Sequence, residues 1–157
     1  IIYSKGMIYL AADHRGFALK ESLKTLLTEE GFSFEDTGAF TLDPEDDYVD
    51  FAMRAAEKIA QDPMNHKGIL ICGSGHGMDV VANKYRGLHA AWVDSHESAV
   101  QSREHGNTNV LVLGADWLAE EKAKDIVLTW LKTPFSGEER HVRRLKKIEE
   151  IEKRNFK

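Results

Sequence analysis

The 157-residue sequence predicts an α/β fold: a five-stranded parallel sheet with helices on both faces. Apolar runs of strand length alternate with segments whose apolar residues recur at the helical period. The run "GILIC" at 68–72 is apolar throughout, as in a strand covered on both faces. Because no repeat or flexible linker interrupts this alternation, residues 7–157 are predicted to form one domain. Residues 1–6 are read as an upstream extension or a cloning remnant.

Each element expected in the first half of the chain has its own local signal. "MIYLAAD" at 7–13 predicts a buried strand, and a helix follows over 15–31, where a stripe of leucines ends at Gly31. "FSFED" at 32–36 predicts a short second strand, followed by the acidic loop "FTLDPEDDY". A helix with an apolar side is expected at 51–60, and the strand 68–72 leads through a glycine-rich loop into a helix that includes 80–82.

The second half continues the alternation and then adds a helix. Strands are expected at 88–93 and 109–114, and helices at 98–105 and 120–132. A last helix is expected from about Gly137, where Ser136 stands three residues before Glu139, the spacing of a capping box. Because the five-unit core is already complete, this helix packs either on its own subunit or on a partner. Its apolar stripe consists of Val142, Leu145, Ile148 and Ile151.

The composition restricts the partners and the compartment. A formal net charge of -5 disfavours nonspecific binding to nucleic acid or to an anionic membrane, because both need a basic surface. No apolar stretch approaches the roughly 20 residues of a membrane-spanning helix. The single cysteine, Cys72, cannot form an internal disulfide, which favours a reducing compartment, so a cytoplasmic protein is expected.

Candidate functional groups gather at the predicted strand ends, where open α/β sheets bind their ligands. We expect them to converge on one cleft beyond the carboxyl ends of the strands. They are Asp13, His14 and Arg15 after the first strand, Cys72 and "GSGHG" after the third, Asp94 and His96 after the fourth, and "REHGNTN" before the fifth.

The loop Gly73-Ser74-Gly75-His76-Gly77 is typical of an anion site. Alternating glycines let backbone amides point at a ligand oxygen, and the helix behind the loop adds the partial positive charge of its N-terminus. Such a site suits a phosphate or a developing oxyanion, whereas the structural alternative is a tight turn. The residue order is not that of a dinucleotide fingerprint, a nucleophile elbow or a Walker A loop.

The position of Cys72 at the end of its strand has two interpretations. Free cysteines are often buried simply to pack. Alternatively, the loop amides and the helix N-terminus favour the thiolate of Cys72, which could act as a nucleophile or as a general base.

Other charged residues also have two readings each. His14 and His105 each follow a carboxylate and are candidate acid/base groups or ordinary surface histidines. Arg140 and Arg144 share a helix face, where they could bind a phosphate or form a solvated basic surface. No spaced ligand set predicts a metal, and the loop "DPEDD" is expected to be a solvated charge run rather than a cation site.

Taken together, five groups of segments resemble the ribose-5-phosphate isomerase B family, which includes galactose-6-phosphate isomerase subunits. They are "ADHRGF", "DYVDFA", "GILICGSGHGM" with "ANK", "SREH" with "NTNVL", and "ERHVRR". The resemblance runs from Met7 to about Asn155. It implies a Rossmann-like three-layer α/β/α sandwich with an extra C-terminal helix, and an aldose–ketose isomerase of sugar phosphates that needs no cofactor. It also implies a homodimer or homotetramer in which the partner supplies some site residues.

The resemblance further implies roles for individual residues. Cys72 matches the base that moves a proton between C1 and C2 through a cis-enediolate. Ser74 and the loop amides match the anion hole for the enediolate, and Asp13 and His105 match groups that open the sugar ring. The substrate-binding positions are His14, Tyr48, Gly73, Gly75, His76, Gly77, Arg140 and Arg144.

Three positions depart from the family pattern. Gly106 replaces an asparagine that binds a sugar hydroxyl, Asp116 replaces an arginine that helps to hold phosphate, and His76 replaces an apolar residue. An acid near a phosphate is unfavourable by Coulomb repulsion. Two alternatives therefore stay open: a non-catalytic sugar or sugar-phosphate binding protein on the same fold, and an isomerase of an unphosphorylated sugar.

Overall fold

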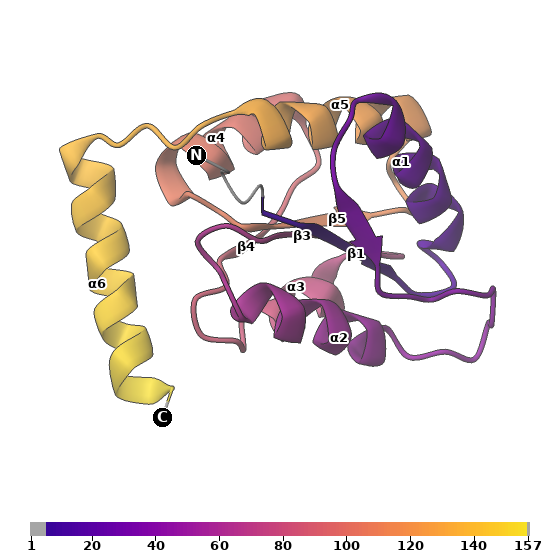
Figure 1. Cartoon of the computed structure of the whole chain (residues 1–157), viewed down its shortest axis with the longest axis horizontal. Coiled ribbons are helices and arrows are strands. Elements are labelled where there is room, and N and C mark those ends of the chain that lie inside the picture. The colour runs from indigo at the N-terminus through magenta and orange to yellow at the C-terminus, as the bar shows by residue number, and fades with distance from the viewer. Residues whose placement is uncertain (1–5, 157) are drawn as a thin grey trace.

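A computed structural model describes residues 6–156, which form a five-stranded sheet in the order β2-β1-β3-β5-β4 (Figure 1). All neighbouring strands are parallel, as predicted. Cys72 pairs with Gly114, so β3 and β5 end side by side. The strands are β1 (Ile8–Ala12), β2 (Phe34–Asp36), β3 (Lys67–Cys72), β4 (Ala90–Trp92) and β5 (Val110–Gly114).

Helices cover both faces of the sheet. In Figure 1, α1, α4 and α5 lie on one side of the strands and α2 and α3 on the other. This arrangement confirms the three-layer sandwich, and α6 is the extra C-terminal helix. The helices are α1 (Phe17–Glu29), α2 (Tyr48–Ala60), α3 (His76–Ala82), α4 (His96–Gly106), α5 (Glu120–Lys132) and α6 (Glu139–Asn155).

Alternate residues of the central strands fill two separate cores. Ile69 and Leu111 pack under α1 and α5, whereas Leu70 and Val112 pack under α2 and α3. All four side chains are fully buried, and each contributes roughly 1.5–3 kcal/mol of hydrophobic stabilisation. Because both faces are covered, the strands read as unbroken apolar runs in the sequence.

The starts of α2 and α6 differ from the prediction. The helix α2 begins at Tyr48 rather than at 51, because its first turn exposes Tyr48 and Val49 and the apolar stripe begins only at Phe51. The predicted capping box before α6 is wrong. Gly137 has a φ of 68°, which turns the chain, and Ser136 Oγ instead accepts a hydrogen bond from the Glu138 amide at 3.3 Å.

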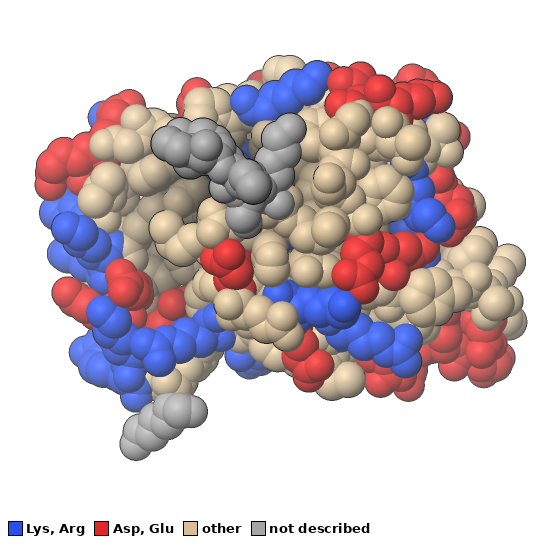
Figure 2. Space-filling model, in the orientation of Figure 1, with Lys and Arg blue, Asp and Glu red and all other residues tan. Residues whose placement is uncertain are grey.

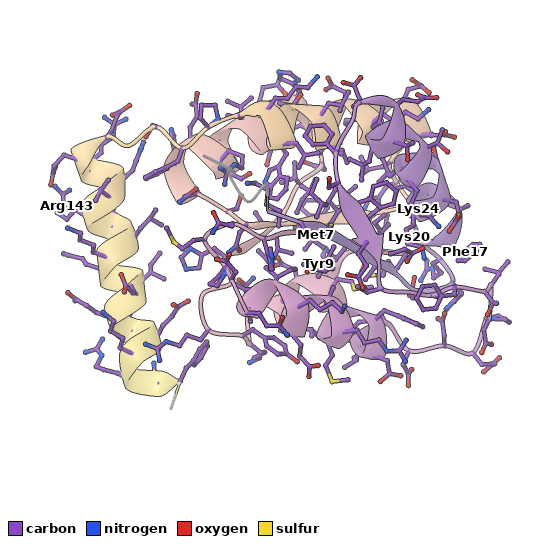
Figure 3. All side chains as sticks on the ribbon, in the orientation of Figure 1. Met7, Tyr9, Phe17, Lys20, Lys24 and Arg143 are labelled. Carbon is purple, nitrogen blue, oxygen red and sulfur yellow. The ribbon has the colours of Figure 1, made fainter. Side chains whose placement is uncertain are left out.

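The helix α6 stands apart from the sandwich, at the left of Figure 1. It contacts the end of α4, and farther along it Glu152 lies 3.3 Å from His89. Lys and Arg side chains gather along this edge of the surface (Figure 2), and Arg143 projects away from the sheet (Figure 3). Ile148 and Ile151 are 44% and 48% exposed, so part of the apolar stripe is uncovered in the single chain.

The helices of residues 6–156 are all too short or too polar to cross a membrane. Of the predicted extension at 1–6, only Gly6 lies within the described residues.

Candidate active site

Cys72 ends β3 and is 5% exposed. Its thiol sulfur accepts a hydrogen bond from the Gly75 amide at 3.1 Å, while its carbonyl accepts one from the Ala115 amide at 2.9 Å. The sulfur is therefore both packed at the strand end and directed at the glycine loop. Packing and acid–base chemistry, the two interpretations of Cys72 that its sequence position allowed, are therefore compatible with each other.

The glycines of the loop are required by close approaches. Gly75 has a φ of 85°, and a Cβ there would lie 2.8 Å from the Trp92 ring. A Cβ on Gly77 would lie 2.3 Å from Cζ of Tyr48, so the Tyr48 ring rests on the loop. Only glycine permits this packing, which brings α2 and α3 together beside Cys72.

The two non-glycine residues of the loop are Ser74 and His76. Ser74 Oγ accepts a hydrogen bond from the His76 amide at 3.2 Å, and the Ser74 carbonyl accepts one from Trp92 Nε1 at 2.8 Å. The centre of the His76 ring lies 5.7 Å from that of Trp92 and 6.4 Å from that of Trp117. Since Trp117 is 57% exposed, these rings form an aromatic rim at the open side of the loop.

The end of β1 brings a carboxyl group to this edge. Asp13 is 5% exposed, and its Oδ1 accepts hydrogen bonds from the amides of Arg15 and Gly16, both at 3.0 Å. Burial raises the pKa of Asp13 despite these two hydrogen bonds and the neighbouring His14. A carboxyl group whose pKa is raised is better suited to exchange protons with a substrate than an ordinary surface aspartate.

The acidic loop contributes a residue that the sequence did not single out. Asp46 Oδ1 lies 2.7 Å from Nδ1 of His14 and also accepts the His14 amide at 3.1 Å. The Asp46 carboxylate accepts a hydrogen bond from the protonated imidazole, which raises the pKa of His14. The Asp46 side chain is only 8% exposed, so the expectation of a solvated charge run is wrong for this residue. No local pattern marked it, because its partner lies 32 positions away.

Asp13, His14 and Asp46 are the one group within residues 6–156 whose donor atoms are close enough to hold a cation, all within 4.8 Å of one another. Asp46 and His14 already bind each other, and two of the three groups belong to the predicted sugar site. The arrangement therefore fits an oriented histidine beside a buried acid.

His105, Arg140 and Arg144 do not join this group in the single chain. The helix α4 starts after the carboxyl end of β4 and runs back, so His105 lies at the amino ends of the strands. That edge is roughly 13 Å from Cys72, the length of four strand residues. The expected convergence of His105 with Cys72 on one cleft is therefore wrong within one chain.

Contacts fix the start of α6 at that far edge. The His105 ring centre lies 4.3 Å from that of His141, and the Ser136 amide donates to the Glu104 carbonyl at 3.2 Å. Burial and the nearby His105 lower the pKa of His141. Arg140 pairs with Glu138 at 2.7 Å at the start of the same helix. Of the other candidates, His96 also lies outside the cleft, because its ring contacts Asp125 of α5 at 3.0 Å.

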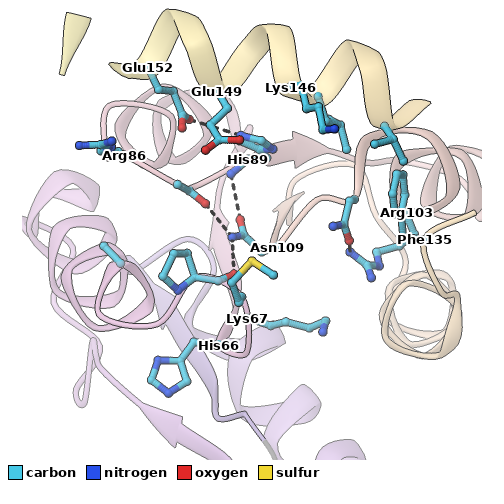
Figure 4. A pocket seen from close by; sticks show the side chains of 17 residues that line it. His66, Lys67, Arg86, His89, Arg103, Asn109, Phe135, Lys146, Glu149 and Glu152 are labelled. Atoms are coloured by element: carbon cyan, nitrogen blue, oxygen red, sulfur yellow. Dashed lines mark hydrogen bonds and ion pairs between the residues drawn. The ribbon is translucent and has the colours of Figure 1, made fainter. Parts of the chain in front are cut away.

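A cavity of about 810 Å³ lies at this far edge, between α6 and the amino ends of the strands (Figure 4). Lys67, Arg103 and His89 face it from the sandwich, and Lys146 and Glu149 from α6. Of the candidate groups at the predicted strand ends, Arg103, Asn107 and Asn109 of the segment "REHGNTN" line it, and the residues to which the resemblance assigns a role do not. The cavity is thus separate from the Cys72 cleft.

Two known proteins are similar to nearly the whole length of this chain. The probable ribose-5-phosphate isomerase B of Mycoplasma genitalium is 40% identical over 146 residues, which cover 93% of this chain and 95% of that protein. Ribose-5-phosphate isomerase B of Mycolicibacterium paratuberculosis is 37% identical over 146 residues, 93% of this chain and 91% of that protein.

A solved structure and a family model extend the similarity to the fold. The crystal structure of the Mycoplasma genitalium enzyme with bound ribulose-5-phosphate has a TM-score of 0.93 at 38% identity, covering 96% of this chain and 99% of that one. The model of the Ribose/Galactose Isomerase family matches residues 8–148. As the resemblance in its sequence predicted, the chain belongs to the ribose/galactose isomerase family.

Proposed function

We propose that this protein interconverts ribose 5-phosphate and ribulose 5-phosphate, or a closely related pentose or hexose phosphate pair, through a cis-enediolate. Membership of the family makes it an aldose–ketose isomerase acting on a sugar phosphate. The observation that carries the proposal is the position of Cys72, whose sulfur meets the glycine loop beside Asp13 and Tyr48.

In this mechanism Cys72, as the thiolate, removes the proton from C2 of the open-chain aldose. The electrons of that C–H bond form the C1–C2 double bond, and the carbonyl oxygen on C1 takes the negative charge of an enediolate. The thiol then returns a proton to C1, while the hydroxyl proton on O2 passes to O1, leaving a ketone at C2. Atoms and charge balance without a metal or a redox partner.

The loop residues stabilise the negative charge that develops. Ser74 and the amides of Gly73 and Gly77 act as donors to the enediolate oxygens, in the manner of an oxyanion hole, while the Gly75 amide that donates to the Cys72 sulfur supports the thiolate and joins the hole once the sulfur is protonated. Asp13 and the histidine oriented by Asp46, His14, lie at the adjacent strand end, where they contact the sugar hydroxyls.

The active unit in this proposal is a homodimer, alone or within a homotetramer. His105, which assists ring opening, and the phosphate-binding Arg140 and Arg144 come from the partner subunit. Three observations support this: these residues lie at the opposite edge from Cys72, α6 stands away from its own sandwich, and Ile148 and Ile151 leave apolar surface for a partner. We assign the protein to the cytoplasm, in keeping with its single cysteine.

An isomerisation screen tests the function. Wild-type protein is incubated with pentose and hexose phosphates, and with the corresponding free sugars, in deuterated water. Ketose formation and deuterium at the exchanged carbon are expected with a sugar phosphate, and the variant Cys72→Ala should lose both. Binding without exchange would point instead to a non-catalytic protein, and turnover of free sugars alone would point to an unphosphorylated substrate.

A further inference from the structure

Three loops that follow neighbouring strands meet at Gly73. Arg15 follows β1, Gly73 follows β3 and Asp116 follows β5, and these strands are adjacent in the sheet. Arg15 Nη2 forms an ion pair with Asp116 Oδ2. The Asp116 amide donates to the Gly73 carbonyl at 3.0 Å, so the acid is held in place from both its backbone and its side chain.

The guanidinium of Arg15 packs directly against Gly73. A Cβ at this position would lie 2.5 Å from both Cζ and Nε of Arg15, so any larger residue would displace the arginine. Arg15 is thus held between the Asp116 carboxylate and Gly73, the residue that follows Cys72 in the chain. An arginine fixed in this way loses less conformational entropy on binding an anion than a free surface arginine does.

The charges of the pair change the expectation for Asp116. Alone, its carboxylate would repel a phosphate dianion at this edge. Arg15 balances that charge and uses one terminal nitrogen to do so, which leaves further N–H donors of its guanidinium for another anion. The Arg15 side chain is 55% exposed and that of Asp116 is 29% exposed, so the guanidinium is the more open of the two.

We propose that Arg15 binds the phosphoryl group of the sugar phosphate and that Asp116 orients it, which makes this pair a determinant of specificity for phosphorylated substrates. The inference rests on the proposed isomerase function. Cys72 is buried and reaches the reacting carbons, whereas Arg15 lies at the open side, where the far end of a substrate projects. A flat guanidinium matches two phosphate oxygens at once.

Four variants test the pair: Arg15→Ala, Arg15→Lys, Asp116→Asn and the double variant Arg15→Ala/Asp116→Asn. Lys124→Ala, which removes a partly exposed positive charge that pairs with Glu120 and Glu121 on α5, is the control. Arg15→Ala should raise KM for ribose 5-phosphate, or for the phosphate the screen identifies, and Kd for inorganic phosphate by about tenfold or more, with kcat within about threefold. Arg15→Lys should have KM and Kd values between those of wild type and Arg15→Ala, because lysine keeps the positive charge but lacks the planar guanidinium that binds two phosphate oxygens at once.

The double variant gives the sharpest expectation. Arg15→Ala alone leaves Asp116 unpaired and repulsive, so adding Asp116→Asn should recover part of the lost affinity for inorganic phosphate. Thermal melting monitored by circular dichroism establishes that each variant is folded.

Two results would overturn the proposal. One is an unchanged Kd for inorganic phosphate in folded Arg15→Ala, and the other is a fall in kcat with phosphate affinity intact. If wild-type protein turns over no sugar phosphate, the isomerase function itself fails, and calorimetry with inorganic phosphate still decides the role of Arg15.

Discussion

Mixing two inactive variants should restore activity if the site is shared between subunits. Cys72→Ala removes the base at one edge of the sheet, and His105→Ala removes the ring-opening group at the other, roughly 13 Å of strand away. Each variant alone should retain less than about 1% of wild-type activity, since acid–base groups contribute on the order of a hundredfold or more. A mixed dimer, however, pairs the intact Cys72 of one chain with the intact His105 of the other.

The size of the recovery follows from the symmetry of a two-fold dimer. Random exchange of equal amounts makes half of the dimers mixed, and each mixed dimer has one intact site of two, so roughly a quarter of wild-type activity should return. Mixed dimers isolated with two different affinity tags should have roughly half. The assay is ketose formation from the sugar phosphate that wild-type protein converts, after joint refolding of the two variants.

A matched control excludes simple stabilisation by mixing. The double variant Cys72→Ala/His105→Ala combined with Cys72→Ala contains no intact site in any pairing and should stay inactive. If the first mixture also stays inactive although mixed dimers have formed, Cys72 and His105 do not act together across the interface. The assignment of His105 to the partner's site would then be wrong.

Three further changes test the site within one chain. Burial raises the pKa of Asp13, so the contribution of its protonated form to stability is present at low pH and is lost as pH rises through the raised pKa. Asp13→Asn should therefore raise Tm more at pH 7 than at pH 3, while it reduces turnover. An equal change in Tm at both pH values would contradict this reasoning. Asp46 raises the pKa of His14, so Asp46→Asn should lower that pKa in an NMR titration of the imidazole, and stabilisation by the pair should be present at acid pH and lost as pH rises through the raised value. Gly77→Ala should push the Tyr48 ring from the loop, where a Cβ would lie 2.3 Å from Cζ, and should reduce kcat/KM by about tenfold or more, whereas an unchanged kcat/KM would remove Tyr48 from the site.

Much of the cleft was predictable because its parts lie at strand ends that have local signals. The apolar run of β3 ends at Cys72, and the glycines after it mark a turn into a helix, so both position and chemistry could be read along the chain. Asp13 and His14 follow β1 in the same way. Parallel strands place their carboxyl ends together, which is why these residues meet.

Other parts of the site depend on partners that are distant in the sequence. Asp46 was read as part of a solvated acidic loop, yet it is buried against His14. Asp116 was expected to repel a phosphate, yet Arg15, 101 positions away, neutralises it. Neither pairing has a sequence period or spacing, because each depends on how loops from different strands come to rest on the sheet.

Hydrophobic periodicity and turn residues are local properties of the chain, so they were sufficient to predict the α/β class, the parallel sheet and the chemistry of the Cys72 loop. The edge of the sheet that each charged residue occupies depends on the folded path of the chain and could not be predicted in this way. A helix that joins two parallel strands must run back along the sheet, so its two ends lie at opposite edges. His105 lies near the end of α4 and is therefore far from Cys72, and contacts with the end of α4 hold the start of α6 at the same edge. Charge pairs such as Arg15 with Asp116 form only once that path has brought separate loops together.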